Sequence, residues 1–178
     1  MKRLVLLLSV LVVLVASAAR ADDHRPPRAT LHVAGKVQEG HRYHADGWST
    51  SSEPGYCDIS FATGFSKFGK PIRRTSRDEI VVRLHKPAMP REVEAQSWPR
   101  VNDDGQAAGQ PTPLPWALRP HITGGGITAW EVVVLAPSAP GHLYLGVGAY
   151  WADEDGCSGS PLDLGSQYAA WNFHVLTR

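Results

Sequence analysis

Cysteine is scarce in this chain: only Cys57 and Cys157 occur among its 178 residues, and they form no C-x-x-C pair. Neither cysteine adjoins a lysine, arginine or histidine that would activate a thiol. The G-x-S-x-G pattern of a serine nucleophile is also missing, because Ser158 and Ser160 stand in other surroundings. These absences remove the common signatures of thiol redox enzymes and of serine hydrolases.

Positive charge is not in excess. The chain has 18 lysines and arginines against 17 acidic residues, and the basic residues are scattered apart from Arg73, Arg74 and Arg77. Domains that bind nucleic acid carry a concentrated basic patch. We therefore expect no nucleic-acid partner.

Long hydrophobic runs are absent outside the N-terminus. There, Lys2 and Arg3 precede an apolar run, residues 4–16, which is followed by the small-residue site Ala19-Arg20-Ala21. This three-part pattern predicts a secretory signal peptide over residues 1–21. The run is shorter than the ~20 residues that span a bilayer, so no membrane span is expected in the mature chain. An uncleaved anchor is the alternative.

Cleavage after Ala21 would leave 157 of the 178 residues, enough for one domain with a core. Three of the 18 basic residues would be lost, so 15 would face 17 acidic ones, a formal charge of −2. In an exported chain, an even number of cysteines predicts a disulfide. We expect a secreted, extracellular protein with a Cys57–Cys157 bridge, which would contribute about 4–5 kcal/mol by chain entropy. A reactive or metal-bound pair is the alternative.

Helical periodicity is absent too, and 17 glycines and 14 prolines interrupt the chain. Residues 142–151 instead alternate as a strand does. One set comprises Leu143, Leu145, Val147, Ala149 and Trp151, and the other His142, Tyr144, Gly146, Gly148 and Tyr150. We place the first set inward, because two glycines on a core face would leave a void.

The closing segment, residues 169–178, alternates in the same way and is predicted to be the antiparallel partner. Trp171, Phe173 and Val175 would face inward, and Ala170, Asn172 and His174 outward. Further short strands are predicted near residues 30–33, 79–85, 92–98 and 127–135, whereas the proline-rich stretch 111–122 allows only a broken or edge strand. Residues 41–56 are predicted to form turns. Many short strands with turns between them favour an all-β sandwich or barrel.

The run Pro140–Ala149, followed after a loop by Trp171–Val175, resembles the final two strands of bacterial immunoglobulin-like domains. The resemblance implies a two-sheet antiparallel sandwich with Greek-key connections, and a binding or spacing role in preference to catalysis. We therefore expect a flexible N-terminal arm over residues 22–28 and one β-sandwich domain over residues 29–178. The extended N-terminal segment, residues 22–78, would add strands or wrap the sandwich.

In such a sandwich the last two strands share a sheet with the third, here residues 93–98. Their outward sets would then meet on one face, which predicts a ligand-binding site made of Tyr144, Tyr150, Asn172, His174, Glu94 and Trp98. Gly146 and Gly148 would leave a bare track on which a flat ligand could lie. The alternative is that the N-terminal segment covers this face.

The sequence contains three weaker candidates for a binding or metal site. Trp48, Tyr56, Trp98, Tyr150 and Trp151 fall at predicted strand ends or in loops, where they either fill the core or form an exposed binding patch. His41, His44 and Asp46 imply no complete ligand set, so we predict a solvated loop and no metal site. The acidic loop Asp153–Asp155, with Asp163 nearby, leaves calcium binding open.

No catalytic residue, cofactor or metal is assigned. We expect a secreted, non-catalytic binding module whose partner is an extracellular protein or a glycan. The first alternative is a secreted hydrolase that acts on polysaccharide or cell-wall material. A metal-dependent extracellular protein is the second alternative.

Overall fold

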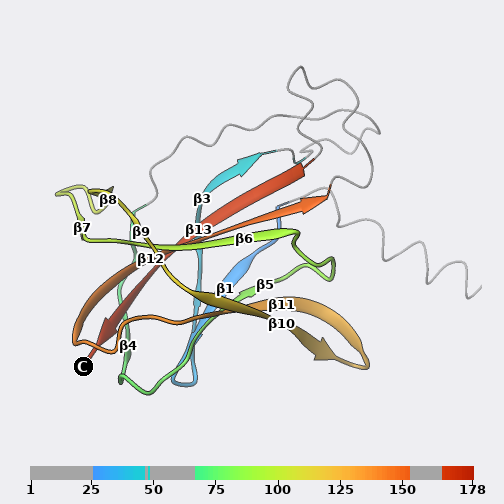
Figure 1. Ribbon diagram of the computed structural model, residues 1–178, viewed down its shortest axis with the longest axis horizontal. Helices are drawn as coiled ribbons and strands as arrows, with labels where there is room; N and C mark the ends of the chain where they lie inside the picture. Colours follow the sequence, from blue (N-terminus) through green and yellow to red (C-terminus); the bar gives the residue numbers. More distant parts are fainter. Residues whose placement is uncertain (1–25, 47, 49–66, 153–165) are drawn as a thin grey trace, which may run out of the picture.

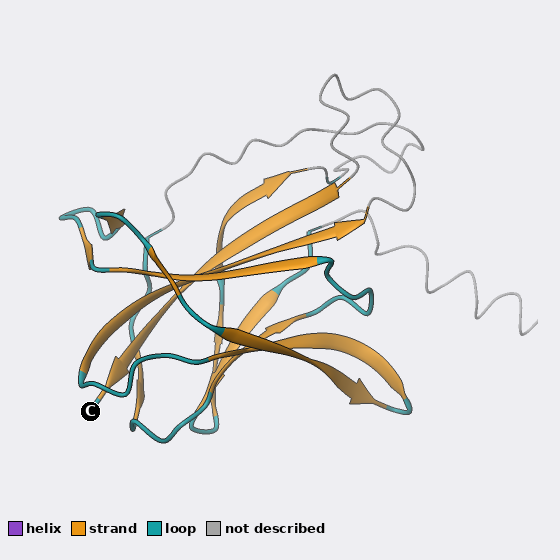
Figure 2. Cartoon of the chain, viewed as in Figure 1, coloured by secondary structure: helices purple, strands orange, loops and turns teal. Residues whose placement is uncertain are grey.

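The computed structural model describes residues 26–46, 48, 67–152 and 166–178. These residues form strands and no helix (Figure 2). The strands are β1 (Ala29–Val33), β2 (Lys36–Glu39), β3 (His41–Asp46), β4 (Ile72–Arg74), β5 (Ile80–Leu84), β6 (Glu92–Trp98), β7 (Arg100–Val101), β8 (Ala107–Ala108), β9 (Thr112–Pro113), β10 (Trp116–Thr123), β11 (Gly126–Val134), β12 (Gly141–Ala152) and β13 (Ser166–Thr177). No apolar helix long enough to cross a membrane occurs in these ranges.

Two sheets form the body of the protein. The first sheet has the strand order β10-β11-β5-β1-β2, and the second has the order β3-β13-β12-β6-β9. Figure 1 shows them as two layers, with β3, β13, β12 and β6 in one and β1, β5, β10 and β11 in the other. All pairs within these orders are antiparallel, and β4 adds to β13 in parallel. The predicted all-β class with antiparallel sheets is confirmed.

The inner faces of the two sheets share one hydrophobic core. Leu31, Val82 and Val132 of the first sheet belong to the same buried cluster as Val147 and Trp171 of the second. Burial of each such large side chain stabilises the fold by about 1.5–3 kcal/mol. The predicted inward sets are confirmed: Leu145, Val147, Ala149, Trp151, Trp171, Phe173 and Val175 are at most 1% exposed, and Leu143 packs against the cluster.

The pairing of the last strands is also confirmed. β12 and β13 pair antiparallel over twelve residues each, from Gly141 opposite Thr177 to Ala152 opposite Ser166. On its other side β12 pairs with β6, as expected for a sheet that contains residues 93–98. Because side chains alternate between faces along each strand, this register brings the outward sets of three strands onto one surface.

The N-terminal segment adds strands to both sheets. β1 and β2 belong to the first sheet and β3 to the second, and Gly40 is the residue between β2 and β3. A Cβ at Gly40 would lie 2.7 Å from Cζ of Phe173, so only glycine lets the chain pass this close to the core. The prediction of turns over residues 41–56 is wrong for residues 41–46, which form β3. Polar residues suit this strand because it lies at the sheet edge and is largely solvated.

The end of the predicted arm touches the first sheet, because the Arg28 carbonyl accepts a hydrogen bond of 2.9 Å from the His85 amide. β4 is held by the buried side chain of Arg74, which donates to Thr177 Oγ1 (2.9 Å) and to the carbonyls of Asp78 (3.0 Å) and Pro137 (2.6 Å). Burial lowers the pKa of Arg74, and the charge of Asp78 partly opposes that effect.

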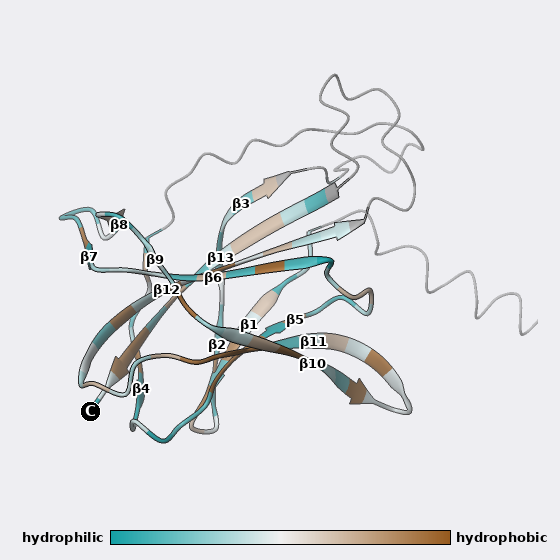
Figure 3. Cartoon of the chain, viewed as in Figure 1, coloured by the Kyte–Doolittle hydropathy of each residue, from teal (hydrophilic) through white to brown (hydrophobic). Residues whose placement is uncertain are grey.

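β10 forms one edge of the first sheet and contains Pro120, which confirms the prediction for the proline-rich stretch. Its hairpin with β11 turns at Gly124 and Gly125, whose φ angles of 62° and 86° favour glycine. Figure 3 shows hydrophobic colour near the hairpin tip, where Ile122 and Ile127 pair and are 62% and 41% exposed.

Candidate functional site

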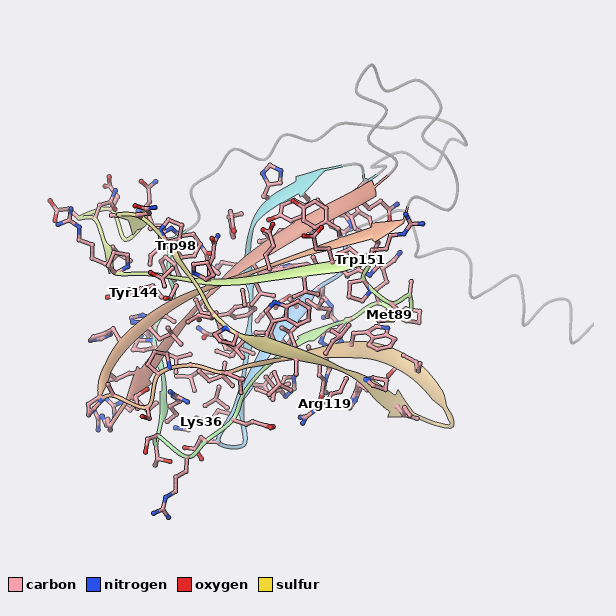
Figure 4. The ribbon with its side chains drawn as sticks, viewed as in Figure 1. Lys36, Met89, Trp98, Arg119, Tyr144 and Trp151 are labelled. Carbon is pink, nitrogen blue, oxygen red and sulfur yellow. The ribbon has the colours of Figure 1, made fainter. Side chains whose placement is uncertain are left out.

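The outer face of the second sheet carries all six residues of the predicted binding site. Tyr144 lies opposite His174 on β13 and opposite Trp98 on β6, while Glu94 lies opposite Gly148. Trp98 and Tyr144 are found at the same end of this sheet in Figure 4. The structure therefore brings together the face that alternation and the resemblance predicted, and ligand binding by that face stays a prediction.

Accessibility divides these six residues. Glu94 is exposed, and Tyr144, Tyr150 and Trp98 are half-buried. Asn172 and His174 are only 4% and 9% exposed, although they point to the outer face. Part of the sheet is therefore covered.

The predicted bare track over the two glycines is wrong. A Cβ at Gly146 would lie 2.5 Å from two ring carbons of Trp98, and one at Gly148 would lie 2.5 Å from the hydroxyl of Tyr168. Rings from β6 and β13 thus lie across the glycines, and the backbone of the N-terminal segment does not. Large rings on neighbouring strands fold over glycine because this buries apolar surface at no steric cost.

A short stretch of the N-terminal segment does cover one end of the face. We call residues 67–70 the strap. The Phe68 ring lies 5.2 Å from Tyr144 and 6.0 Å from Trp98, measured between ring centroids. Gly69 O accepts a hydrogen bond of 3.0 Å from His174 Nδ1, and Lys70 O accepts one of 3.0 Å from Gln38. The alternative of a covered face thus holds at this end.

His174 is fixed in one tautomer by these contacts. Since Gly69 O can only accept, Nδ1 of His174 carries a proton, and its Nε2 accepts from His142 Nδ1 at 2.8 Å in the neutral pair. Burial lowers the pKa of His174, the Gly69 hydrogen bond opposes this, and His142 lowers it further. A neutral His174 therefore holds the strap, and its side chain is only 9% exposed.

The other end of the face is lined by tyrosines and carboxylates. We call Tyr43, Tyr150, Tyr168, Glu92 and Glu94 the acidic tyrosine cluster. The rings of Tyr150 and Tyr168 lie 4.3 Å apart, and the Tyr43 hydroxyl shares hydrogen bonds with Gln96 and Tyr168. Burial raises the pKa of all three tyrosines, and the Glu94 charge raises each further. Glu94 therefore lies near all three phenol groups.

Tyr43, Phe68 and Tyr168 were missed by the sequence analysis. Tyr168 was within reach, because extending the alternation of the closing strand by two residues places it on the outer face, opposite Tyr150. Tyr43 lies where the β3–β13 register shifts between Ala170 and Trp171, and alternation is uninformative at such a bulge. Phe68 reaches the face from the strap, which no periodic pattern marks.

Six aromatic side chains form a continuous row across the outer face. We call them the aromatic strip: Tyr43, Phe68, Trp98, Tyr144, Tyr150 and Tyr168. Ring contacts join Tyr150 to Tyr168 (4.3 Å), Tyr43 to Trp98 (6.4 Å), Trp98 to Phe68 (6.0 Å) and Phe68 to Tyr144 (5.2 Å). The hydrogen bond between Tyr43 and Tyr168 links the two parts. Along β12 the strip extends from Tyr144 to Tyr150, about 20 Å at ~3.4 Å per residue.

The five aromatic residues left open by the sequence divide between core and surface. Trp48 and Trp151 are 1% exposed, with centroids 5.8 Å apart, and their Nε1 atoms donate to the carbonyls of Tyr168 (2.8 Å) and Ala88 (3.1 Å). Trp98 and Tyr150 belong to the aromatic strip. Tyr56 lies outside the described residues.

The outer face of the first sheet is ionic. Glu131 is 7% exposed, and its carboxylate accepts from Arg83 (2.8 and 3.1 Å) and Arg119 (2.7 Å), with His121 Nδ1 at 3.3 Å. Burial opposes ionisation, but these hydrogen bonds and charges outweigh it and hold the pKa of Glu131 below its usual value. The position of Arg119, away from Trp98 and Tyr144, is visible in Figure 4.

In the described ranges, no three His, Cys, Asp or Glu side chains gather to hold a metal ion. His41 and His44 lie on β3, and the His44 ring lies 5.2 Å from the Tyr168 ring, tilted by 57°. Cys57, Cys157, Asp153–Asp155 and Asp163 lie outside the described residues, as do residues 1–21. The predicted disulfide, signal peptide and calcium loop therefore stay predictions.

No protein-family model, no curated protein and no solved structure matches this chain.

Proposed function

We propose that this protein is a secreted, immunoglobulin-like, non-catalytic module that binds a glycan of the cell exterior through the outer face of its second sheet. The aromatic strip is the observation that carries the proposal. Sugar rings present C–H groups that pack on the electron-rich faces of aromatic side chains. The strip suits an extended polymer, because sugars can stack in succession on its partly exposed rings, from Tyr150 to the Phe68 ring that covers Tyr144.

The order of the strands supports the immunoglobulin-like assignment. In that fold, strands A, B, E and D form one sheet and C, F and G the other. Taking β1, β5, β6, β10, β11, β12 and β13 as A to G reproduces both orders, β10-β11-β5-β1 and β6-β12-β13. The strands β2, β3 and β4 would then be additions at the sheet edges.

A glycan is favoured over a protein partner by what the face omits. Protein interfaces are centred on exposed apolar anchors. The exposed large hydrophobic residues of the described chain are Val37, Met89, Trp116, Ile122, Ile127 and Leu135, and none lies on this face.

Binding is favoured over hydrolysis by the placement of the carboxylates. Glycoside hydrolysis needs two carboxyl groups that flank the scissile bond from opposite sides. Glu92 and Glu94 stand two residues apart on β6 and project in the same direction. Such a pair can contact a sugar chain from one side only.

Co-sedimentation with insoluble chitin and cellulose tests the proposal. We expect the wild-type protein to bind at least one of them, and Tyr150→Ala to weaken that binding about fivefold to tenfold, the effect of losing one aromatic anchor. Trp116→Ala is the matched control, because Trp116 is a 38% exposed aromatic residue on the first sheet. Equal weakening by both substitutions, or no binding by the wild type, would contradict the proposed face.

A further inference from the structure

The acidic tyrosine cluster has unpaired negative charge beside its rings. Glu92 lies opposite Tyr150 and Glu94 opposite Gly148, and both carboxylates are exposed. Within the described part of the chain, neither forms an ion pair. Glu131 on the other sheet differs, because its carboxylate forms ion pairs with Arg83 and Arg119.

The charge of Glu94 reaches the rings. Its carboxylate acts on Tyr43, Tyr150 and Tyr168 and, after burial, contributes to raising the pKa of each. Glu92 adds to the effect on Tyr150. A ligand that stacks on these rings therefore enters a negative potential.

A neutral glycan would bind more weakly here than one that carries positive charge. Stacking on Tyr150 would strip water from Glu92 and Glu94 without replacing it, and desolvation of an unpaired charge is unfavourable. An acidic glycan would be repelled. A protonated amine would instead form charge-assisted hydrogen bonds with the carboxylates and be attracted to the tyrosine faces.

We propose that the acidic tyrosine cluster selects a glycan whose sugars carry free, protonated amino groups, as in a polymer of glucosamine. The sugar rings lie on Tyr150 and Tyr168, and the amino groups meet Glu92 and Glu94. The two carboxylates lie on one strand about 6.5–7 Å apart, two strand rises of ~3.3–3.4 Å. They can therefore contact separate amino groups. This inference rests on the proposed glycan-binding function.

Two oligosaccharides of one length test it: oligomers of glucosamine, and the same oligomers with every amine acetylated. Titration calorimetry with the full secreted protein is run at about pH 6, where carboxyl groups of model peptides are ionised. We expect the free-amine oligomer to bind at least about tenfold more tightly, a difference of 1.4 kcal/mol. Glu94→Gln should remove most of that preference. Glu39→Gln, which neutralises an exposed glutamate on β2 of the first sheet, should leave it unchanged.

The outcomes separate the inference from the proposed function. Equal binding of the two oligomers would overturn selection for amines and keep a glycan-binding face. Failure of both to bind would overturn both proposals. Poly-L-lysine is the third probe: if it binds as tightly as the amino-sugar oligomer, and Tyr150→Ala weakens neither, the partner is a basic polypeptide and the inference is wrong.

Discussion

The outer faces of the two sheets differ in whether their carboxylates are paired with arginine. On the first sheet, Glu131 is nearly buried and is satisfied by Arg83 and Arg119 within the face. On the second sheet, Glu92 and Glu94 are exposed, and half-buried tyrosines stand beside them. A face whose charges neutralise one another is complete without a ligand. On the second face, Glu92 and Glu94 form no ion pair with any described residue, so both carboxylates are available to the proposed ligand.

Removing Trp171 should have the largest effect, because this residue lies in the core that supports both faces. Trp171 is 1% exposed and packs edge-on against Trp151 at 6.5 Å. Trp171→Ala should lower the free energy of unfolding by about 3–5 kcal/mol, measured by urea denaturation. Trp116→Ala, at an exposed site, should change it by no more than about 0.5 kcal/mol. An unchanged melting temperature for Trp171→Ala would show that the inner and outer faces have been exchanged.

Gly148 tests whether the second face is packed or bare. Gly148→Ala should cost about 1–3 kcal/mol, because the new methyl group collides with the Tyr168 ring, and Gly148→Arg should cost more. Combining Gly148→Ala with Tyr168→Ala should remove most of the collision, since the two changes act on one contact. Stability unaffected by Gly148→Arg would mean that the ring does not cover the glycine.

Matched charge removals compare the two faces directly. Glu131→Gln should destabilise by about 1–3 kcal/mol, because Arg83 and Arg119 lose a hydrogen-bonded carboxylate. Glu94→Gln should stay within about 0.5 kcal/mol, because that carboxylate has no ion pair in the described chain. Thermal and urea unfolding of the two variants side by side would measure the difference. Equal costs would remove the contrast between the faces.

Acid should produce the smallest and most gradual effect, and it acts on both faces. Burial lowers the pKa of His32 on β1, of His85 directly after β5 and of His174 on β13 below 6.5. The unfolded chain therefore takes up protons before the folded chain does, so stability is full above about pH 6.5 and falls as the pH drops below it. Melting temperatures between about pH 7.5 and pH 5 should follow this trend. His85→Gln should make the decline shallower, and a stability independent of pH in this range would contradict the lowered values.

Much of the second sheet could be predicted because strand alternation is a local property. The two-residue period of a strand correctly predicted that Leu145, Val147 and Trp171 face the core. The same period predicted that Tyr144 and Glu94 point to the opposite face. The polar residues at 41–46 led to a wrong prediction of turns. An edge strand can be polar, and the sequence does not show which strand lies at an edge.

Composition and periodicity by themselves predicted an all-β chain and which residues of the last two strands face the core. That six residues share one outer face followed only when the resemblance to immunoglobulin-like domains placed residues 93–98 in the same sheet. Only the tertiary structure decided what that face is. The rings of Trp98 and Tyr168 cover Gly146 and Gly148. Phe68 contacts the face from residues 67–70, and Tyr43 lies at a register shift between β3 and β13. The physical reason is that the period of a strand follows from its own backbone. The position of an aromatic side chain depends on the space left by residues distant in sequence. Close packing determines that position only when the sheets assemble.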